Sequence, residues 1–181
     1  RLLPQIVYYF WAYLQTVEQG SIEPGSPINI VVPTGNFGNI LAAFYAQKMG
    51  LPINKLICAS NRNNVLFDFF QSGIYNSNRP FYLTTSPSMD ILISSNFERF
   101  LFEMTSRDAA KINKWFQALG TEGRYEVDSS TLDTCRQNMY AGWASEEGVS
   151  QTIAEFYQEH GYVLDPHTAV GVKVYQDYKQ Q

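Results

Sequence analysis

The sequence predicts an α/β protein with three layers, in which helices cover both faces of an open, mainly parallel sheet. Two short apolar segments, at residues 28–32 and 55–60, are typical of strands in a sheet interior, and the first of them is mostly β-branched. A helical pattern separates them, and strand, helix and strand within about 30 residues indicate a βαβ unit with a right-handed crossover. The composition is also globular, because 45% of the 181 residues are hydrophobic and 17% are charged.

The chain begins with a helical pattern at residues 4–19, in which Pro4 suits the first turn. Apolar residues cover nearly the whole circumference of this helix, so we expect it to be buried on most sides. A linker rich in Gly, Ser and Pro leads from it to the first strand.

The first strand is followed by a glycine-rich turn at residues 35–39 and by a helix that begins near Ile40 and ends at Gly50. This geometry points the first free N–H groups of the helix at the space above the strand end, which favours an anion, usually a phosphate. Gly35 and Gly38 remove Cβ atoms where a ligand must approach the backbone, and the asparagine amides add neutral donors. The alternative is a tight βα turn that binds nothing.

A polar run, Asn61-Arg62-Asn63-Asn64, follows the second strand and precedes a helix at residues 65–71. The run lies at the sheet edge where open α/β proteins bind ligands. Asparagine is also a preferred N-cap residue, and we favour capping over ligand contact.

The rest of the chain is largely helical, after irregular residues 72–86 with a short extended piece at 81–84. A long helix is predicted at residues 91–104, and its polar run 94–96 faces a cavity or solvent rather than the core. Further helices are predicted at 107–119, 131–139, 151–159 and 169–179, with a short strand at 125–127. Residues 128–130, and Asp165 or Thr168, are expected to cap two of these helices.

Charge and residue counts exclude several kinds of protein. A net charge of −4 without a basic run argues against a nucleic-acid or anionic-membrane partner, and no apolar stretch is long enough to span a bilayer. Cys58 and Cys135 are not spaced for zinc or a disulfide framework, so we expect a cytoplasmic protein. Two histidines argue against a multi-histidine metal site. The chain begins at Arg1 without an initiating methionine, so we expect an internal piece of a longer protein.

The motifs narrow the chemistry further. No Gly-Lys-Ser/Thr follows the loop, which disfavours a nucleotide triphosphatase, and the glycine spacing differs from the G-x-G-x-x-G of dinucleotide-binding proteins. A pyridoxal-phosphate enzyme remains, in which the loop holds the cofactor phosphate and a lysine forms the Schiff base. None of the six lysines stands in an obvious site turn, so that lysine is expected outside this chain.

Three segments carry a resemblance to a known family, and it runs through essentially all 181 residues. They are PTGNFGNILAAFYAQKMGLPINKLICASNRNN, SPSMDILISSNFER and DPHTAVG. The chain resembles the internal and C-terminal-side part of threonine synthase, a fold-type II pyridoxal-phosphate lyase that converts O-phosphohomoserine and water to threonine and phosphate. The resemblance implies that residues 1–181 form part of the cofactor-binding large domain and a helical C-terminal-side region. It also implies a cofactor-phosphate loop made of Gly35, Asn36, Phe37, Gly38 and Asn39.

Two parts of the family pattern are absent from these residues. The family's Schiff-base lysine lies upstream, and the segment with the hydroxyl partner of the pyridine nitrogen would follow Gln181. We therefore expect no catalytic residue in this chain and no activity from the chain alone. Candidates for the clamp on the substrate phosphate are Ser86, Ser88, Asn96 and Arg99, although capping and surface polarity explain them equally well.

Other interpretations stay open at this point. The parent could be another fold-type II enzyme, a dehydratase or a β-replacement enzyme, or the chain could be a non-catalytic α/β binding protein. His167 is expected to be a packed or capping histidine rather than a catalyst. Exposed apolar surface on the first helix predicts self-association when the rest of the protein is missing.

Overall fold

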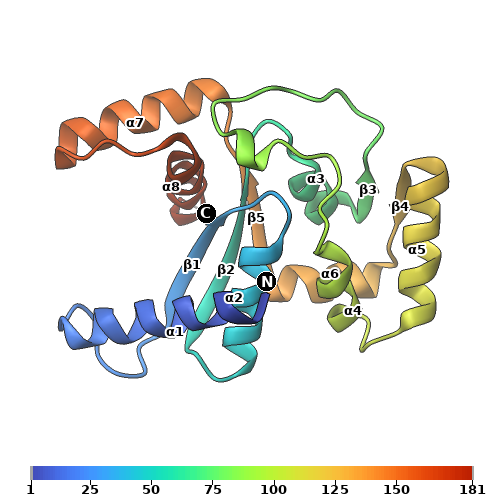
Figure 1. Cartoon of the computed structure of the whole chain (residues 1–181), viewed down its shortest axis with the longest axis horizontal. Coiled ribbons are helices and arrows are strands. Elements are labelled where there is room, and N and C mark those ends of the chain that lie inside the picture. The colour runs from blue at the N-terminus through green and yellow to red at the C-terminus, as the bar shows by residue number, and fades with distance from the viewer. Residues whose placement is uncertain (1, 181) are drawn as a thin grey trace.

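The computed structural model describes residues 2–180 (Figure 1). Within this range three strands form a parallel sheet in the order β1-β2-β5, namely β1 (Ile28–Pro33), β2 (Ile53–Ser60) and β5 (Met139–Trp143). Val32 pairs with Cys58, and Cys58 pairs in turn with Ala141. The predicted α/β class with a mainly parallel sheet is confirmed.

Helices cover both faces of this sheet, because successive side chains of a strand point to opposite faces. Leu56 and Cys58 belong to a large apolar cluster with α1 (Leu2–Glu18) and α2 (Gly38–Lys48). Ile57 and Ala59 belong to a second cluster with α7 (Glu146–His160) and α8 (Pro166–Lys179). Helix α8 contacts all three strands of the sheet, so the second face is covered along its width (Figure 1).

A largely helical region extends from one side of the sheet (Figure 1). It contains α3 (Val65–Ser72), α4 (Phe97–Met104), α5 (Ala109–Glu122) and α6 (Ser129–Asn138), together with the antiparallel pair β3 (Ile74–Asn76) and β4 (Arg124–Glu126). Tyr75 pairs with Tyr125 across β3 and β4, and their rings stack with centroids 5.3 Å apart. Both tyrosines are buried in the core of this region.

The predicted long helix at residues 91–104 is wrong in its first half. A short 3₁₀ turn (Pro87–Met89) is followed by irregular backbone, and α4 begins only at Phe97. The irregular part is held by long-range hydrogen bonds: the Ser94 N–H donates to the Tyr75 hydroxyl at 2.9 Å, and the Ser94 hydroxyl donates to the Gly35 carbonyl at 2.8 Å. These partners lie far away in the sequence, so local periodicity could not reveal them.

Three other expectations need correction. Residues 81–84 form no strand, and the short strand of that region is β3 instead. The predicted helix at residues 131–139 ends at Asn138, and the residues that follow form β5, for which no strand was predicted, and pair with β2. Helix α1 buries only Ile6 and Tyr13 among its described residues, and one apolar face remains exposed.

No helix within residues 2–180 is both long and apolar enough to cross a membrane.

The four helices of the second half are capped by side chains. Asp108, Asp128, Ser145 and Asp165 each accept a hydrogen bond from a backbone N–H in the first turn of α5, α6, α7 and α8 respectively. The expected caps at residues 128–130 and at Asp165 are confirmed, and the Thr168 hydroxyl donates to Asp165 rather than capping the helix itself.

Replacing Asp128 by alanine is expected to lower the free energy of unfolding by about 1 kcal/mol at pH 7, because α6 loses its cap. Hydrogen bonds from the Ser130 hydroxyl, the Lys111 ammonium and the Thr131 N–H hold the pKa of Asp128 well below its usual range. A lowered folded pKa stabilises the fold above the unfolded value of about 3.9 and loses that contribution as the pH falls below it. Urea unfolding between pH 7 and pH 2 should therefore show a shrinking difference between the two proteins.

The variant Asp128→Asn is the matched control, because it keeps a cap acceptor but cannot ionise. It should retain most of the stability at pH 7 and show a weaker pH dependence than the wild type. A difference between Asp128→Ala and the wild type that stays constant down to pH 2 would contradict the role assigned to the carboxylate.

Candidate functional site

A cavity of about 700 Å³ lies at the carboxyl end of β1, in front of the N-terminus of α2. Residues 32–40 form most of its wall, and α1 contributes Leu2 and Gln5. The rest of the wall comes from Ser88, Ser95, Asn96 and Arg99. We call this space the loop cavity. All five residues expected to hold a cofactor phosphate, Gly35 to Asn39, line it.

Phe37 is the residue that turns the chain from β1 into α2. It has a left-handed backbone with φ of 62°, which is uncommon for a residue other than glycine, and it is the N-cap of α2. Its side chain is 1% exposed, and its ring centroid lies 5.0 Å from that of Phe97 and 5.4 Å from that of Phe100. Burial of the ring therefore holds the backbone in a conformation that the turn requires.

The N-terminus of α2 lacks the side-chain cap that α5 to α8 possess. The first N–H groups of any α-helix have no carbonyl partner within the helix, and Phe37 offers no side-chain acceptor to them. These N–H groups lie at the loop cavity, together with the positive end of the helix dipole. The arrangement suits an anion bound by backbone donors.

Carbonyl groups of the loop are already engaged by neighbouring segments. The Ser94 hydroxyl donates to the Gly35 carbonyl, and the Asn96 amide donates to the Asn36 carbonyl, each at 2.8 Å. On the α1 side, the Tyr9 hydroxyl donates to the Asn39 carbonyl at 3.0 Å. Three carbonyl groups of the loop are therefore occupied, from both sides, whereas the first N–H groups of α2 have no side-chain cap.

The two glycines of the loop are required for different reasons. A Cβ atom on Gly35 would lie 2.8 Å from the Ser88 carbonyl oxygen, so this glycine admits the protein's own 3₁₀ turn rather than a ligand. A Cβ atom on Gly38 would meet only the Asn96 amide, at 3.5 Å, in the wall of the loop cavity. Close approach of a ligand can therefore explain the glycine at position 38, whereas the glycine at position 35 is explained by the neighbouring 3₁₀ turn.

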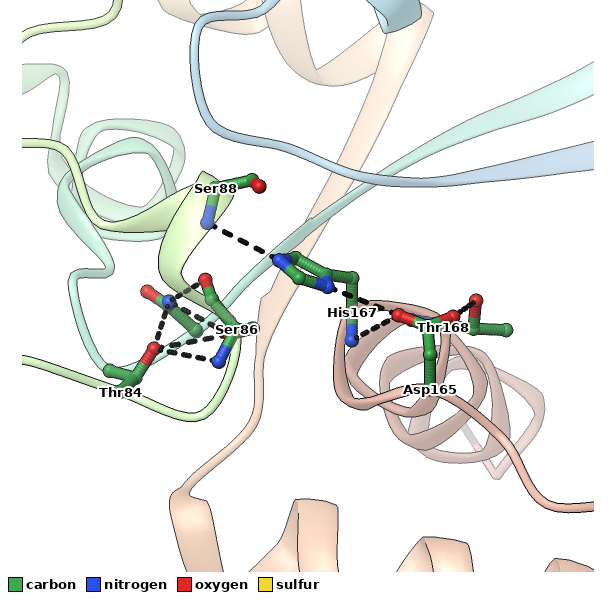
Figure 2. A network of polar contacts seen from close by, with 7 residues as sticks. Thr84, Ser86, Ser88, Asp165, His167 and Thr168 are labelled. Carbon is green, nitrogen blue, oxygen red and sulfur yellow. Dashed lines mark hydrogen bonds and ion pairs between the residues drawn. The ribbon is translucent and has the colours of Figure 1, made fainter.

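The candidates for the substrate phosphate separate into two groups. Ser88, Asn96 and Arg99 line the loop cavity, and Arg99 also lies 4.0 Å from the carboxylate of Glu98. Ser86 is fully buried outside this lining, where its hydroxyl accepts from the Asn61 amide at 3.0 Å (Figure 2). Ser95 lines the cavity and was not among the candidates, although it stands in the same polar run as Asn96.

None of the asparagines after β2 lines the loop cavity, and Asn64 is the N-cap of α3. Asn61 and Asn63 are buried, and their amides donate to the Asp90 carboxylate at 2.8 and 2.9 Å. The Thr84 hydroxyl donates to the same carboxylate at 2.7 Å. The capping interpretation is therefore confirmed for the position of Asn64, although its side chain makes no cap bond, and it is wrong for Asn61 and Asn63. The cluster ties the segment before the 3₁₀ turn to the end of the sheet.

His167 also contacts the 3₁₀ turn from the opposite side. Figure 2 shows its ring between the Ser88 N–H and the Asp165 carboxylate, 3.2 and 3.1 Å away.

No lysine is among the residues that line the loop cavity. Within residues 2–180 no group of three His, Cys, Asp or Glu side chains could hold a metal ion.

Fold and loop together define a class: an α/β protein with a glycine-rich loop between the first strand and the first crossover helix of a parallel sheet. No protein-family model matches the sequence. Human "Threonine synthase-like 1" is 47% identical over 171 residues, which cover 94% of this chain and 23% of that protein. Threonine synthase of Saccharomyces cerevisiae is 41% identical over 185 residues, which cover 95% of this chain and 35% of the enzyme.

A solved structure agrees with these relatives. The structure of threonine synthase from Brucella melitensis with bound pyridoxal phosphate matches with a TM-score of 0.91 and 43% identity, over 97% of this chain and 37% of that one. The chain is therefore similar to threonine synthases over nearly its whole length. It spans about a quarter to a third of the length of these relatives.

Proposed function

We propose that this chain is the part of a threonine synthase that holds the phosphate group of pyridoxal phosphate, and that the whole protein converts O-phosphohomoserine and water to threonine and phosphate. The observation that carries the proposal is the uncapped N-terminus of α2, which opens from the Gly35–Asn39 loop into the loop cavity. Similarity to threonine synthases across this loop and its surroundings supports the same assignment.

In this proposal the N–H groups of residues 36–39 hold the cofactor phosphate, and Gly38 leaves room for it. The bound cofactor supplies an electron sink for proton loss next to the substrate amine. Arg99 provides the cationic side chain of the loop cavity, and Ser88 and Asn96 stand on the same wall as neutral donors. We assign these three residues to the substrate phosphate, because a charged partner strengthens hydrogen bonds to an anion.

The reactive lysine is proposed to come from residues outside these 181, since no lysine lines the loop cavity in the described range. The chain alone is accordingly expected to be inactive. The described residues then represent part of the cofactor-binding large domain with a helical C-terminal-side region. A cytoplasmic enzyme is proposed, because both cysteines are free and buried, as in a reducing compartment.

The test is an assay of phosphate release from O-phosphohomoserine by the complete protein with pyridoxal phosphate. Threonine and phosphate should form in equal amounts, and the 181-residue chain alone should release none. The variant Arg99→Met should raise KM for O-phosphohomoserine at least tenfold while the cofactor absorbance stays unchanged. A complete protein that deaminates serine or threonine but releases no phosphate would overturn the assignment in favour of a dehydratase.

Self-association of the chain is a further proposal, and it rests on the exposed apolar face of α1. This face consists of Leu3, Val7, Tyr8, Trp11 and Leu14, and Trp11 is 64% exposed. Apolar patches of this kind on an isolated chain favour association. Sedimentation velocity over a concentration series should show oligomers, and Trp11→Ser should reduce them. Trp143→Ser, at an exposed tryptophan outside this face, is the control. A clean monomer at all concentrations would contradict the proposal.

A further inference from the structure

The 3₁₀ turn at Pro87–Met89 forms part of the wall of the loop cavity and lies directly against the Gly35–Asn39 loop. The ideal Cβ position of Gly35 is 2.8 Å from the Ser88 carbonyl oxygen and 3.3 Å from the Met89 Cα atom. Ser88 itself lines the loop cavity. A small displacement of this turn would therefore change the space available to a ligand at the loop.

Hydrogen bonds within the turn do not fix its position relative to the sheet and α8. The Met89 N–H donates to the Ser86 carbonyl, and the Asp90 N–H donates to the Pro87 carbonyl, so both bonds are local. From the β2 side, the turn is anchored by Ser86 and Asp90 through the buried asparagines. From the α8 side, Nε2 of His167 accepts a hydrogen bond from the Ser88 N–H (Figure 2).

Both ring nitrogens of His167 are used, and their roles follow from their partners. A backbone N–H can only donate, so Nε2 accepts from Ser88 and carries no proton. The proton then lies on Nδ1, which donates to Asp165. The Thr168 hydroxyl and His167 keep the pKa of Asp165 below its usual range, so this partner stays a carboxylate. Asp165 thereby selects the neutral tautomer that can hold Ser88.

We propose that His167 is a positioning residue, whose neutral ring, oriented by Asp165, holds the Ser88 peptide against Gly35 and so keeps the loop cavity in the shape that binds a phosphate. The inference rests on the proposed function of the loop. The His167 side chain is 32% exposed and belongs to neither apolar cluster. Its removal should therefore affect the turn far more than the stability of the fold.

Three variants of His167 distinguish the effect of the hydrogen bond to Ser88 from the effect of side-chain size. The amide oxygen of His167→Gln reaches about as far from the backbone as Nε2, whereas that of His167→Asn reaches only as far as Nδ1. His167→Ala removes the ring and with it both of its hydrogen-bonding nitrogens. Titration of the chain with inorganic phosphate and with pyridoxal phosphate, followed by calorimetry, should show about fivefold weaker binding for the Ala and Asn variants. This change corresponds to one net hydrogen bond. The Gln variant should bind within about twofold of the wild type.

Two further measurements make the outcome decisive. Urea midpoints should agree among the four proteins, because a purely structural role would lower them together with binding. Hydrogen exchange of the Ser88 amide should be faster in the Ala and Asn variants and unchanged in the Gln variant. Equal binding or equal Ser88 exchange in all four proteins would overturn the inference, and so would equal loss of binding in Gln and Asn. If the wild type binds no phosphate, the proposed function fails, and Ser88 exchange still decides the role of His167.

Discussion

Replacing Phe37 by alanine is expected to lower the free energy of unfolding by about 3–5 kcal/mol, the range for deletion of a buried aromatic side chain. The ring is almost fully buried and packs edge-on against Phe97 and at a tilt against Phe100, so its removal leaves a cavity between α2 and α4. Without the ring, nothing compensates the left-handed backbone at this residue, which costs alanine as well.

Equilibrium unfolding in urea measures this change, and Phe81→Ala is the matched control. Phe81 is 51% exposed in an irregular segment, so the same substitution there should cost well under half as much. The variant Phe37→Leu should lie between the two, because it keeps part of the buried volume. Equal losses at Phe37 and Phe81 would show that the Phe37 ring does not anchor the turn.

The second large effect is a contrast between the two glycines of the loop. Gly35→Ala is expected to destabilise the fold by about 1–3 kcal/mol, because the added methyl group overlaps a backbone oxygen that cannot rotate away. Gly38→Ala is expected to leave stability unchanged or raise it by up to about 1 kcal/mol, since alanine is the better helix former. Its methyl group stands in the wall of the loop cavity and should weaken binding of pyridoxal phosphate at least tenfold.

Both variants should be measured by urea unfolding and by titration with pyridoxal phosphate. The two glycines serve as controls for each other, because they carry the same substitution three residues apart. A Gly35→Ala protein as stable as the wild type would show that the 3₁₀ turn can move to accommodate the added methyl group at little cost. A Gly38→Ala protein with unchanged affinity would show that the ligand does not approach the backbone there, and would count against the phosphate loop.

Local patterns were sufficient for much of the fold and for the centre of the site. The two short apolar segments predicted β1 and β2, the helical spacing predicted α2, and the turn between β1 and α2 predicted where an anion could bind. The acidic caps of α6 and α8 were also legible, because a cap acts within its own turn. The wall of the loop cavity was harder to predict from the sequence. Ser88, Asn96 and Arg99 were candidates, but the sequence did not show that they lie together, and Ser95 was not among the candidates.

By itself the sequence determined the α/β class, the strand–loop–helix unit around residues 28–50, and the resemblance to threonine synthases. Tertiary structure alone decided that residues 90–96 leave the helical path, that Gly35 admits Ser88, and that Asn61 and Asn63 bind Asp90. The reason is physical: periodicity, capping and turn propensity act over a few residues. Hydrogen bonds such as that from Ser94 to Gly35 or from Ser88 to His167 join residues 59 and 79 positions apart. Only the folded chain brings such partners together.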